Sequence, residues 1–301
     1  MENMELKFDV VLLGATGFIA DYILKEISDC FSVCAISRTR PVNGRFDQWF
    51  SFDDLKKGKY IISAVNCIYN VADKGRYKYE IEEDQYLRQM KLNAPNFTEL
   101  FKDLSVINVK YLITMGSSEE YGITNQVLDE KKIVCPVTSY GVSKVSLLIQ
   151  AQAWAALSVG IYTHLRPFVV FGKNQNDDMF IPSMIRTLKN GQDFAMTGGE
   201  QFRYFTYAGT IGNVIKYLLT HPPIESEILN IIDCFYFTIK NVARMIECKI
   251  NRGRVLLGKL PYRDYEVWDQ KVPSNRLNFL AKPKDSFEKL LGEVINYELQ
   301  G

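Results

Sequence analysis

The spacing of Tyr140 and Lys144 is the feature of this sequence that most directly suggests chemistry. On a helix, residues four positions apart share a face, so the Lys144 ammonium can lie near the Tyr140 phenol. A phenol has an ordinary pKa of about 10, and a neighbouring cation lowers it toward the range of a general acid or base. A second Tyr-x-x-x-Lys, Tyr236 to Lys240, lies far along the chain, and we interpret it as structural.

The segment 116–122 is expected to bring further polar groups to the same place. It follows an apolar run, 111–115, so its side chains should emerge at the carboxyl edge of the predicted sheet, where such folds bind ligands. Ser117 can hydrogen-bond a substrate carbonyl or alcohol, and Glu119 is a candidate additional acid or base. The alternatives are a turn or N-cap role for Ser117 and a solvated carboxylate for Glu119.

A glycine-rich turn at 14–20 separates the first predicted strand from the first predicted helix. Glycine lets the backbone turn sharply, and the following helix N-terminus offers unpaired N–H groups to an anion. The spacing Gly-x-x-Gly-x-x-Ala differs from Gly-x-Gly-x-x-Gly, and any strand-to-helix turn can contain two glycines. Its place in the first βα turn nevertheless favours a dinucleotide site, formed by Gly14, Thr16, Gly17, Phe18 and Ile19.

The end of the second predicted strand indicates which dinucleotide binds. NAD-binding units usually place an acid here for the ribose 2′-hydroxyl, whereas a 2′-phosphate needs arginine. Ser37, Arg38 and Arg40 occupy this place, with no acid among residues 37–40. They favour NADP(H) over NAD, and the alternative is that both arginines are solvated loop residues.

Strand patterns alternate with helix patterns through the first half of the chain. Such alternation predicts an α/β fold of the Rossmann type, with a doubly wound parallel sheet. Beyond Pro167 the elements become shorter, so we expect a dinucleotide-binding domain at 1–167 and a smaller mixed substrate lobe at 168–301, with some segments crossing back. The expected strands are 8–13, 31–36, 60–65, 111–115 and 160–165, and the expected helices are 17–27, 83–104 and 140–157.

Composition narrows the class of protein. Of 301 residues 47% are hydrophobic, and 36 basic against 35 acidic residues leave a net charge of +1, which argues against nucleic-acid binding by bulk charge. Six scattered cysteines without a C-x-x-C pair and only two histidines argue against a metal site and for free thiols in the cytoplasm. The apolar-leaning stretch 147–162 is too short and too polar to span a membrane, and the acidic N-terminus does not resemble a signal peptide.

In combination these motifs resemble the extended short-chain dehydrogenase/reductases that act on nucleotide sugars. The resemblance extends over nearly the whole chain and implies catalytic roles for Ser117, Tyr140 and Lys144, with Lys144 also holding the cofactor ribose. It rests on the glycine motif at 14–20, Asn93 in the helix before the fifth strand, the Ser-x-x-x-Tyr-Gly loop from Ser117, the pair Tyr140 and Lys144, and the segment 165–172.

The resemblance also implies two arginines for the substrate's diphosphate. Arg203 lies in a segment similar to the family's arginine segment, and Arg263 lies in 260–266, which resembles a later Pro-Tyr-Arg-x-x-Glu segment. Two guanidiniums can bind a diphosphate bidentately and balance its charge. Two departures are visible: no acid occurs near Gly209, and the pair Val-Asn at 65–66 is expected where the family has small residues beside the cofactor.

The implied reaction is NADPH-dependent reduction of the 4-keto group of a nucleotide-diphospho-deoxysugar, for surface-polysaccharide synthesis. Tyr140 would donate the proton, and Ser117 would hydrogen-bond the forming alkoxide. A 4-epimerase or 4,6-dehydratase that holds its dinucleotide tightly is the alternative, with Glu119 as an added base, and a non-catalytic NADP-binding protein is a third reading.

Relatives of this type imply a homodimer joined by a four-helix bundle, built here from 83–104 and 140–157. An apolar stripe on the second helix is consistent with that role, and the alternative is that it packs against the sheet. The stripe consists of Leu147, Leu148, Ala151, Trp154 and Ala155.

Overall fold

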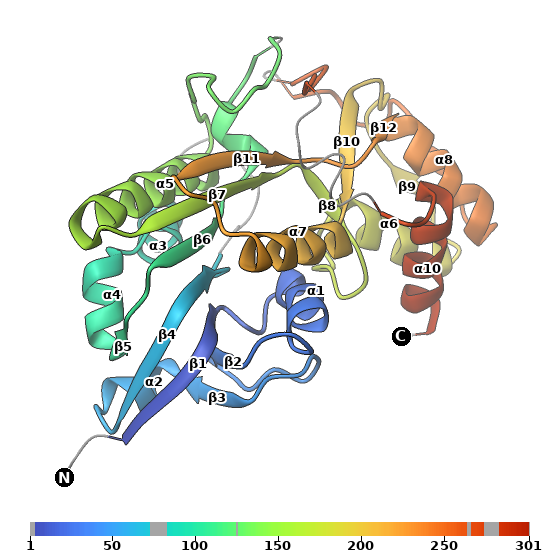
Figure 1. Ribbon diagram of the computed structural model, residues 1–301. Coiled ribbons are helices and arrows are strands. Elements are labelled where there is room, and N and C mark those ends of the chain that lie inside the picture. The colour runs from blue at the N-terminus through green and yellow to red at the C-terminus, as the bar shows by residue number, and fades with distance from the viewer. Residues whose placement is uncertain (1–3, 73–82, 125, 264–265, 274–282, 301) are drawn as a thin grey trace. The chain divides into compact units, whose positions relative to one another are not determined.

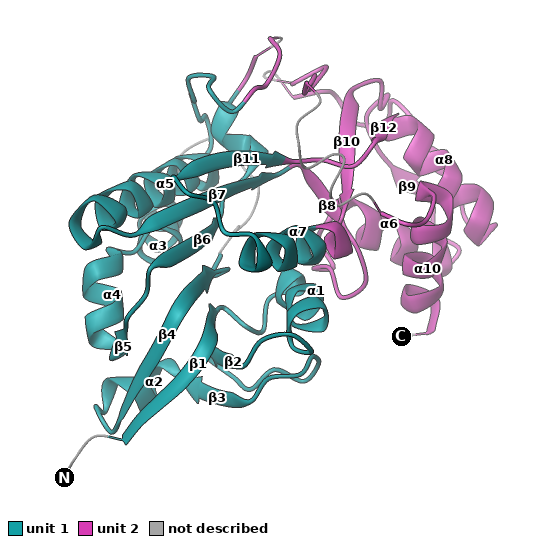
Figure 2. Cartoon of the chain, viewed as in Figure 1, with its two compact units in different colours: residues 1–122, 130–167, 211–230 teal, residues 123–129, 168–210, 231–301 magenta. Residues whose placement is uncertain are grey.

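The structure is a computed structural model, and it describes residues 4–72, 83–124, 126–263, 266–273 and 283–300. The chain forms two compact units, shown in different colours in Figure 2. The first comprises 1–122, 130–167 and 211–230, and the second comprises 123–129, 168–210 and 231–301. The chain therefore enters the second unit briefly at 123–129 and again after residue 167, and it returns to the first unit for 211–230.

A large sheet forms the centre of the first unit, with strand order β11-β7-β6-β4-β1-β2-β3, and β5 pairs with β4. The strand pairings among β1 to β7 are all parallel, which confirms the predicted Rossmann-type sheet. The strands are β1 (Met4–Leu13), β2 (Val33–Ser37), β3 (Gln48–Ser51), β4 (Tyr60–Tyr69), β5 (Val106–Ile107), β6 (Tyr111–Met115), β7 (Ile161–Pro167) and β11 (Glu227–Ile231).

Helices cover both faces of this sheet (Figure 1). Side chains alternate between faces along a strand, and the last four residues of β1, Val10 to Leu13, are fully buried on both. One face packs on α4 and α5 through side chains such as Phe101 and Trp154, whose rings are 6.0 Å apart. The helices are α1 (Phe18–Ile27), α2 (Phe52–Lys56), α3 (Glu83–Asn93), α4 (Phe97–Asp103), α5 (Ser139–Ser158) and α7 (Ala208–Thr220), with a short 3-10 helix η1 (Ser118–Tyr121).

The apolar stripe on α5 lies in this core. Leu147, Leu148, Ala151 and Trp154 are all buried within the single chain, and Ala155 is half-buried against the same cluster. The stripe therefore packs against the sheet of its own unit.

Two elements differ from the sequence prediction. The expected helix 83–104 is two helices, because Pro95 disfavours helical backbone in the preceding residue, and Asn96 caps α4 by accepting from the N–H groups of Thr98 and Glu99. The expected strand 60–65 continues as β4 to Tyr69. Its carboxyl end is thus formed by Asn70 and the residues after it, and the predicted role of 65–66 at this edge is wrong.

The second unit is a smaller mixed assembly. Strand β10 pairs antiparallel with β12 and parallel with β8, and β9 pairs with β13. The ring of Phe287 lies within 5.6 Å of the rings of Phe171, Phe205, Phe235 and Phe237 in the core. The elements are β8 (Val169–Phe171), α6 (Phe180–Lys189), β9 (Phe194–Ala195), β10 (Phe202–Tyr207), β12 (Phe235–Thr238), α8 (Ile239–Ile250), β13 (Val255–Leu256) and α10 (Phe287–Gln300).

All six cysteines are free thiols, and Cys34 and Cys67 are buried. Within the described part of the chain, no group of three His, Cys, Asp or Glu side chains is arranged to hold a metal ion. None of the helices formed by described residues has the length and apolar character needed to cross a membrane.

Candidate active site

The glycine turn at the end of β1 is fixed by its contact with the end of β4. Gly14 has a φ of +84°, and a Cβ at this position would lie 2.8 Å from the backbone carbon of Asn70. Gly17 is the N-cap of α1, and it contributes no side chain to cap the helix. The first N–H groups of α1 can therefore receive an anion such as a pyrophosphate, with Thr16 exposed beside them. The predicted residues Phe18 and Ile19 form the start of α1 and are half-buried.

Asn70 belongs to this turn, although the sequence analysis missed it. Its backbone N–H donates to the carbonyl of Leu13, and its side-chain Nδ2 donates to the carbonyl of Gly14 at 3.4 Å. Asn70 is buried, and these two hydrogen bonds hold the glycine turn against the end of β4. The signal for Asn70 was hidden because the length of β4 was underestimated.

The predicted selector of the dinucleotide lies at the end of β2. Ser37 is buried; its hydroxyl donates to the carbonyl of Thr39 at 2.7 Å and accepts from the Trp49 indole N–H at 3.1 Å. Arg38 and Arg40 are exposed, and the Arg40 guanidinium lies 5.6 Å from the Phe46 ring centre. Ser37 therefore shapes the loop, whereas the two arginines remain accessible to an anionic group.

The loop after β6 carries Ser117 and Glu119. The Ser117 hydroxyl accepts from the Glu119 N–H at 3.2 Å, as the N-cap of η1, so its proton can be donated elsewhere. The Glu119 carboxylate accepts from the Thr138 hydroxyl at 3.0 Å, and Thr138 is the N-cap of α5. The structure therefore holds the Ser117 loop against the beginning of the helix that carries Tyr140.

Tyr140 and Lys144 lie on the first two turns of α5, as predicted. Lys144 is buried and its Nζ donates to the carbonyl of Met115 at 2.8 Å, two residues before Ser117. The same Nζ lies 5.5 Å from the centre of the half-buried Tyr140 ring. One residue before Lys144, Ser143 donates to the Tyr140 carbonyl at 2.7 Å and accepts from Asn93 at 2.9 Å. The helix face that carries the pair is therefore anchored to β6 and to α3.

The pKa of Tyr140 differs from the expectation. Burial raises the pKa of Tyr140, and the negative charges of Glu119 and Glu120 raise it further, so the predicted lowering by Lys144 does not occur in the protein alone. Burial lowers the pKa of Lys144 to about 8, against an opposing effect of Glu120. At neutral pH Tyr140 is therefore a protonated phenol, which is the form that donates a proton.

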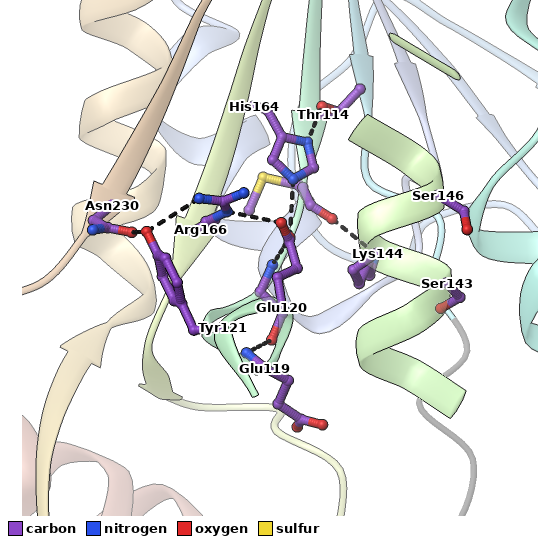
Figure 3. Close-up of polar contacts among 12 residues, drawn as sticks. Thr114, Glu119, Glu120, Tyr121, Ser143, Lys144, Ser146, His164, Arg166 and Asn230 are labelled. Carbon is purple, nitrogen blue, oxygen red and sulfur yellow. Dashed lines mark hydrogen bonds and ion pairs between the residues drawn. The ribbon is translucent and has the colours of Figure 1, made fainter. Parts of the chain in front are cut away.

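Glu120 is the carboxylate that the sequence analysis overlooked (Figure 3). It is fully buried; its Oε1 accepts from the Ser117 N–H at 2.8 Å and from His164 Nε2 at 2.9 Å. Its Oε2 accepts from Arg166 Nε at 2.7 Å. No pattern marked Glu120, because it stands next to Glu119 in a loop and its partners lie on a strand more than 40 positions away.

These contacts continue to both sides of Glu120 within the first unit (Figure 3). His164 Nδ1 lies 2.8 Å from the Thr114 hydroxyl of β6. Arg166 donates to the Tyr121 hydroxyl at 3.1 Å, and that hydroxyl donates to Asn230 of β11 at 2.8 Å. All five of these side chains are buried, so this polar chain ties β6, β7, β11 and the Ser117 loop together.

The two predicted diphosphate ligands lie in the second unit. Arg203 on β10 forms an ion pair with Glu266 at 2.8 Å, and both side chains are largely buried. Glu266 follows Arg263 by three positions, so Arg203 lies beside the segment that carries Arg263, whose side chain is exposed. Residues 264–265 of this segment lie outside the described residues. The second Tyr-x-x-x-Lys does not share a helix face, because Tyr236 is on β12 and Lys240 is on α8.

Comparison with known proteins gives one family match. A model described as the NAD dependent epimerase/dehydratase family matches residues 10–231. The N-acetyl-alpha-D-glucosaminyl-diphospho-ditrans,octacis-undecaprenol 4-epimerase of Escherichia coli O157:H7 is 24% identical over 259 residues, covering 84% of this chain and 76% of that protein. The CDP-abequose synthase of Salmonella muenchen is 23% identical over 215 residues, covering 68% of this chain and 67% of that protein.

A solved structure shares the whole fold. The UDP-glucuronic acid 4-epimerase from Bacillus cereus, in complex with UDP-glucuronic acid and NAD, superimposes with a TM-score of 0.82. The alignment covers 98% of this chain and 99% of that chain, at 20% sequence identity.

Proposed function

Because the chain belongs to the NAD-dependent epimerase/dehydratase family and is thus an NAD(P)-dependent enzyme of the extended short-chain dehydrogenase/reductase type, we propose that it moves a hydride at C4 of a diphosphate-linked sugar. The observation that carries this proposal is the placement of Tyr140 and Lys144 on α5, with Lys144 anchored at Met115 beside the Ser117 loop. The three groups come from the edge of the sheet where such folds bind their ligands.

The proposed roles follow from the chemistry of each group. A bound dinucleotide supplies or accepts the hydride. Tyr140 exchanges the proton with the sugar oxygen, Ser117 donates a hydrogen bond to that oxygen, and Lys144 orients the phenol and the cofactor ribose. The uncapped N-terminus of α1 and the exposed Arg38 would hold the dinucleotide phosphates. Arg203 and Arg263 would bind the substrate diphosphate. Arg203 would then bind the diphosphate either in place of Glu266 or together with it.

The reaction that the relatives favour is 4-epimerisation, since the Escherichia coli relative and the Bacillus cereus enzyme are both described as 4-epimerases. In such a reaction Tyr140 must both remove and return a proton, and the hydride returns to the same carbon. The dinucleotide would then stay bound through the cycle. Glu119 has no assigned step in this scheme, because its carboxylate is engaged by the N-cap of α5.

A second candidate is NADPH-dependent reduction of a 4-keto sugar. Arg38 and Arg40 favour it, because they are exposed at the end of β2 and no acid stands between residues 37 and 40. The protonated state of Tyr140 suits proton donation to a forming alkoxide.

One experiment separates the two candidates. The purified protein is incubated with UDP- and CDP-linked hexoses and 4-keto-6-deoxyhexoses, with and without added NADPH. Epimerisation without added cofactor supports the first candidate, and stoichiometric loss of NADPH absorbance with a 4-keto sugar supports the second. Tyr140→Phe should lower either rate by about 10²–10⁴-fold while dinucleotide binding is kept. An unchanged rate in this variant would exclude the proposed role of Tyr140 in either reaction.

The homodimer remains a proposal. The stripe expected at the interface lies in the core, but Ile149 and Leu157 of α5 and Leu87 of α3 are exposed apolar side chains on the same two helices. Light scattering coupled to size exclusion, with Ile149→Glu as the test variant, would decide between a monomer and a dimer through these helices.

A further inference from the structure

Glu120 is the most completely buried carboxylate next to the proposed active site, and the proposed reaction assigns it no step. Both of its oxygens are occupied by donors from other parts of the first unit: the Ser117 N–H, His164 and Arg166. It lies between the hydroxyl that would contact the substrate oxygen and the strand that carries its partners, β7.

We propose that Glu120 is a positioning residue of the active site: it fixes the backbone at Ser117 and keeps a permanent negative charge near Lys144 and Tyr140. This inference rests on the proposed roles of Ser117, Tyr140 and Lys144. It assigns Glu120 no contact with substrate or cofactor.

The positional part follows from geometry. The Ser117 N–H donates to Glu120 Oε1 at 2.8 Å, and the Glu120 N–H lies 3.2 Å from the Ser117 carbonyl, so the two residues close a compact turn. Gly116 leaves room for this turn, since a Cβ there would lie 2.3 Å from both Glu120 Oε1 and His164 Nε2. The backbone that carries the Ser117 hydroxyl is therefore held by a carboxylate whose other partners, His164 and Arg166, lie on β7.

The electrostatic part follows from the same contacts. Burial alone would raise the pKa of Glu120, but the interactions with His164 and Arg166 outweigh burial and lower it to about 2, so Glu120 stays ionised at any pH near neutral. Glu120 is the charge that opposes the effect of burial on Lys144 and that adds to the effect of burial on Tyr140. A fixed anion at this position therefore helps Lys144 to stay protonated in a buried site.

Among the described residues, the titratable and charged groups that face this part of the site come from β7, η1 and α5. His164 and Arg166 approach Glu120 from β7, Tyr121 and Glu119 belong to η1, and Tyr140 and Lys144 face it from α5. Arg166 compensates Glu120, and Glu119 adds negative charge near Tyr140. An ion pair that only stabilised the loop, without acting on Lys144, would leave the titration of Lys144 in place when it is removed.

The test is the pH profile of Glu120→Gln. The amide keeps an oxygen that can accept from the Ser117 N–H, but it removes the charge. We expect the alkaline limb of the kcat/KM profile to move down by about one pH unit, because Lys144 loses its nearby anion. At pH 8 we expect about a fivefold loss of kcat/KM, because the protonated fraction of Lys144 falls from about one half to about one tenth, with dinucleotide binding kept. Glu120→Asp keeps the charge, so its limb should stay in place although its rate falls.

Two further variants control for misfolding and for the general effect of removing a buried carboxylate. Removing one partner of a buried pair strands the other charge and can prevent folding, so Glu120→Gln is also combined with Arg166→Met, which removes both charges. The double variant should show a limb displaced in the same direction but by less, because losing the Arg166 cation partly offsets losing the Glu120 anion. Glu298→Gln is the matched control, because Glu298 is another buried carboxylate paired with an arginine, Arg186, in the second unit. Its profile should match that of the unmodified protein.

The outcomes are distinct. An alkaline limb that stays in place in both the single and the double variant overturns the inference. The titration of Lys144 can also be followed without substrate, from the pH dependence of unfolding described in the Discussion, and there too its midpoint should fall by about one unit in Glu120→Gln. If no sugar is turned over, the proposed function fails, but this second measurement still decides the role of Glu120.

Discussion

The buried Lys144 should destabilise the folded protein less as the pH rises above about 8, so that the free energy of unfolding increases. Its pKa is about 8 in the folded protein, against 10.5 for an ordinary lysine. Between these pH values the unfolded chain binds more protons than the folded chain, so the free energy of unfolding increases with pH. A difference of 2.5 pH units, at about 1.4 kcal/mol each, gives a full cost of about 3.4 kcal/mol below pH 8.

The perturbation is Lys144→Met, which removes the charge and keeps most of the side-chain volume. From pH 7 to pH 9.5 the cost of the buried lysine falls to about 1.4 kcal/mol, so the unmodified protein should gain about 2 kcal/mol relative to the variant. The variant leaves the Met115 carbonyl without its donor, which costs about 1–3 kcal/mol, but this cost does not change with pH. Titration of other groups cancels in the comparison.

The assay is urea unfolding of both proteins at the two pH values, under reducing conditions and with tryptophan fluorescence as the signal. Trp154 lies in the core of the first unit and reports on the region that contains α5. Free energies that differ between the two proteins by the same amount at both pH values, within about 0.5 kcal/mol, would refute the reasoning. Lys144 would then be an ordinary lysine, and its predicted role at a buried site would lose its electrostatic basis.

Three further predictions concern other parts of the molecule. Gly14→Ala should lower the free energy of unfolding by more than about 2 kcal/mol, because φ is positive and the new Cβ would meet the backbone of Asn70. Gly58→Ala, also at positive φ but with open space around it, should cost about 1 kcal/mol in the same urea unfolding assay. Burial raises the pKa of Asp233 to about 7, so the folded protein favours the protonated carboxyl, and ionisation of Asp233 at higher pH costs stability. Between pH 5 and pH 8 the free energy of unfolding of the unmodified protein should fall by about 2–3 kcal/mol relative to that of Asp233→Asn, and an equal change in both proteins would contradict this. If NADP(H) is the cofactor, Arg38→Ala combined with Arg40→Ala should weaken NADPH binding about 10–100-fold more than NADH binding in fluorescence titrations, and equal losses would argue for NAD.

The sequence predicted the parts of the site that local spacing determines. The glycine turn, the loop after β6 and the helical pair Tyr140 and Lys144 all depend on residues a few positions apart, and the structure places each of them on the predicted type of element. The extended short-chain dehydrogenase/reductase resemblance is confirmed by the family match. The roles of the individual residues stay predictions.

Long-range packing could not be predicted from the same patterns. The partners of Glu120 are His164 and Arg166, which alternate on β7 and look like any polar residues in a strand sequence. The carboxyl end of β4 was misplaced, because Asn66 interrupts the apolar run in the middle of the strand, where its side chain donates to the carbonyl of Asp9. Asp233 is a similar case: it accepts from the Tyr207 N–H at 2.6 Å at the start of α7, near where the family's acid is missing from the chain.

The glycine turn and the end of β2 would share one ligand, but they tolerate change very differently. Gly14 is held against the backbone of a neighbouring strand, so its conformation exists before any nucleotide arrives and cannot be altered without disturbing the sheet. Arg38 and Arg40 project from a loop and carry no such constraint. Redesign of cofactor preference should therefore begin at the arginines, where a new side chain changes what is recognised and leaves folding untouched.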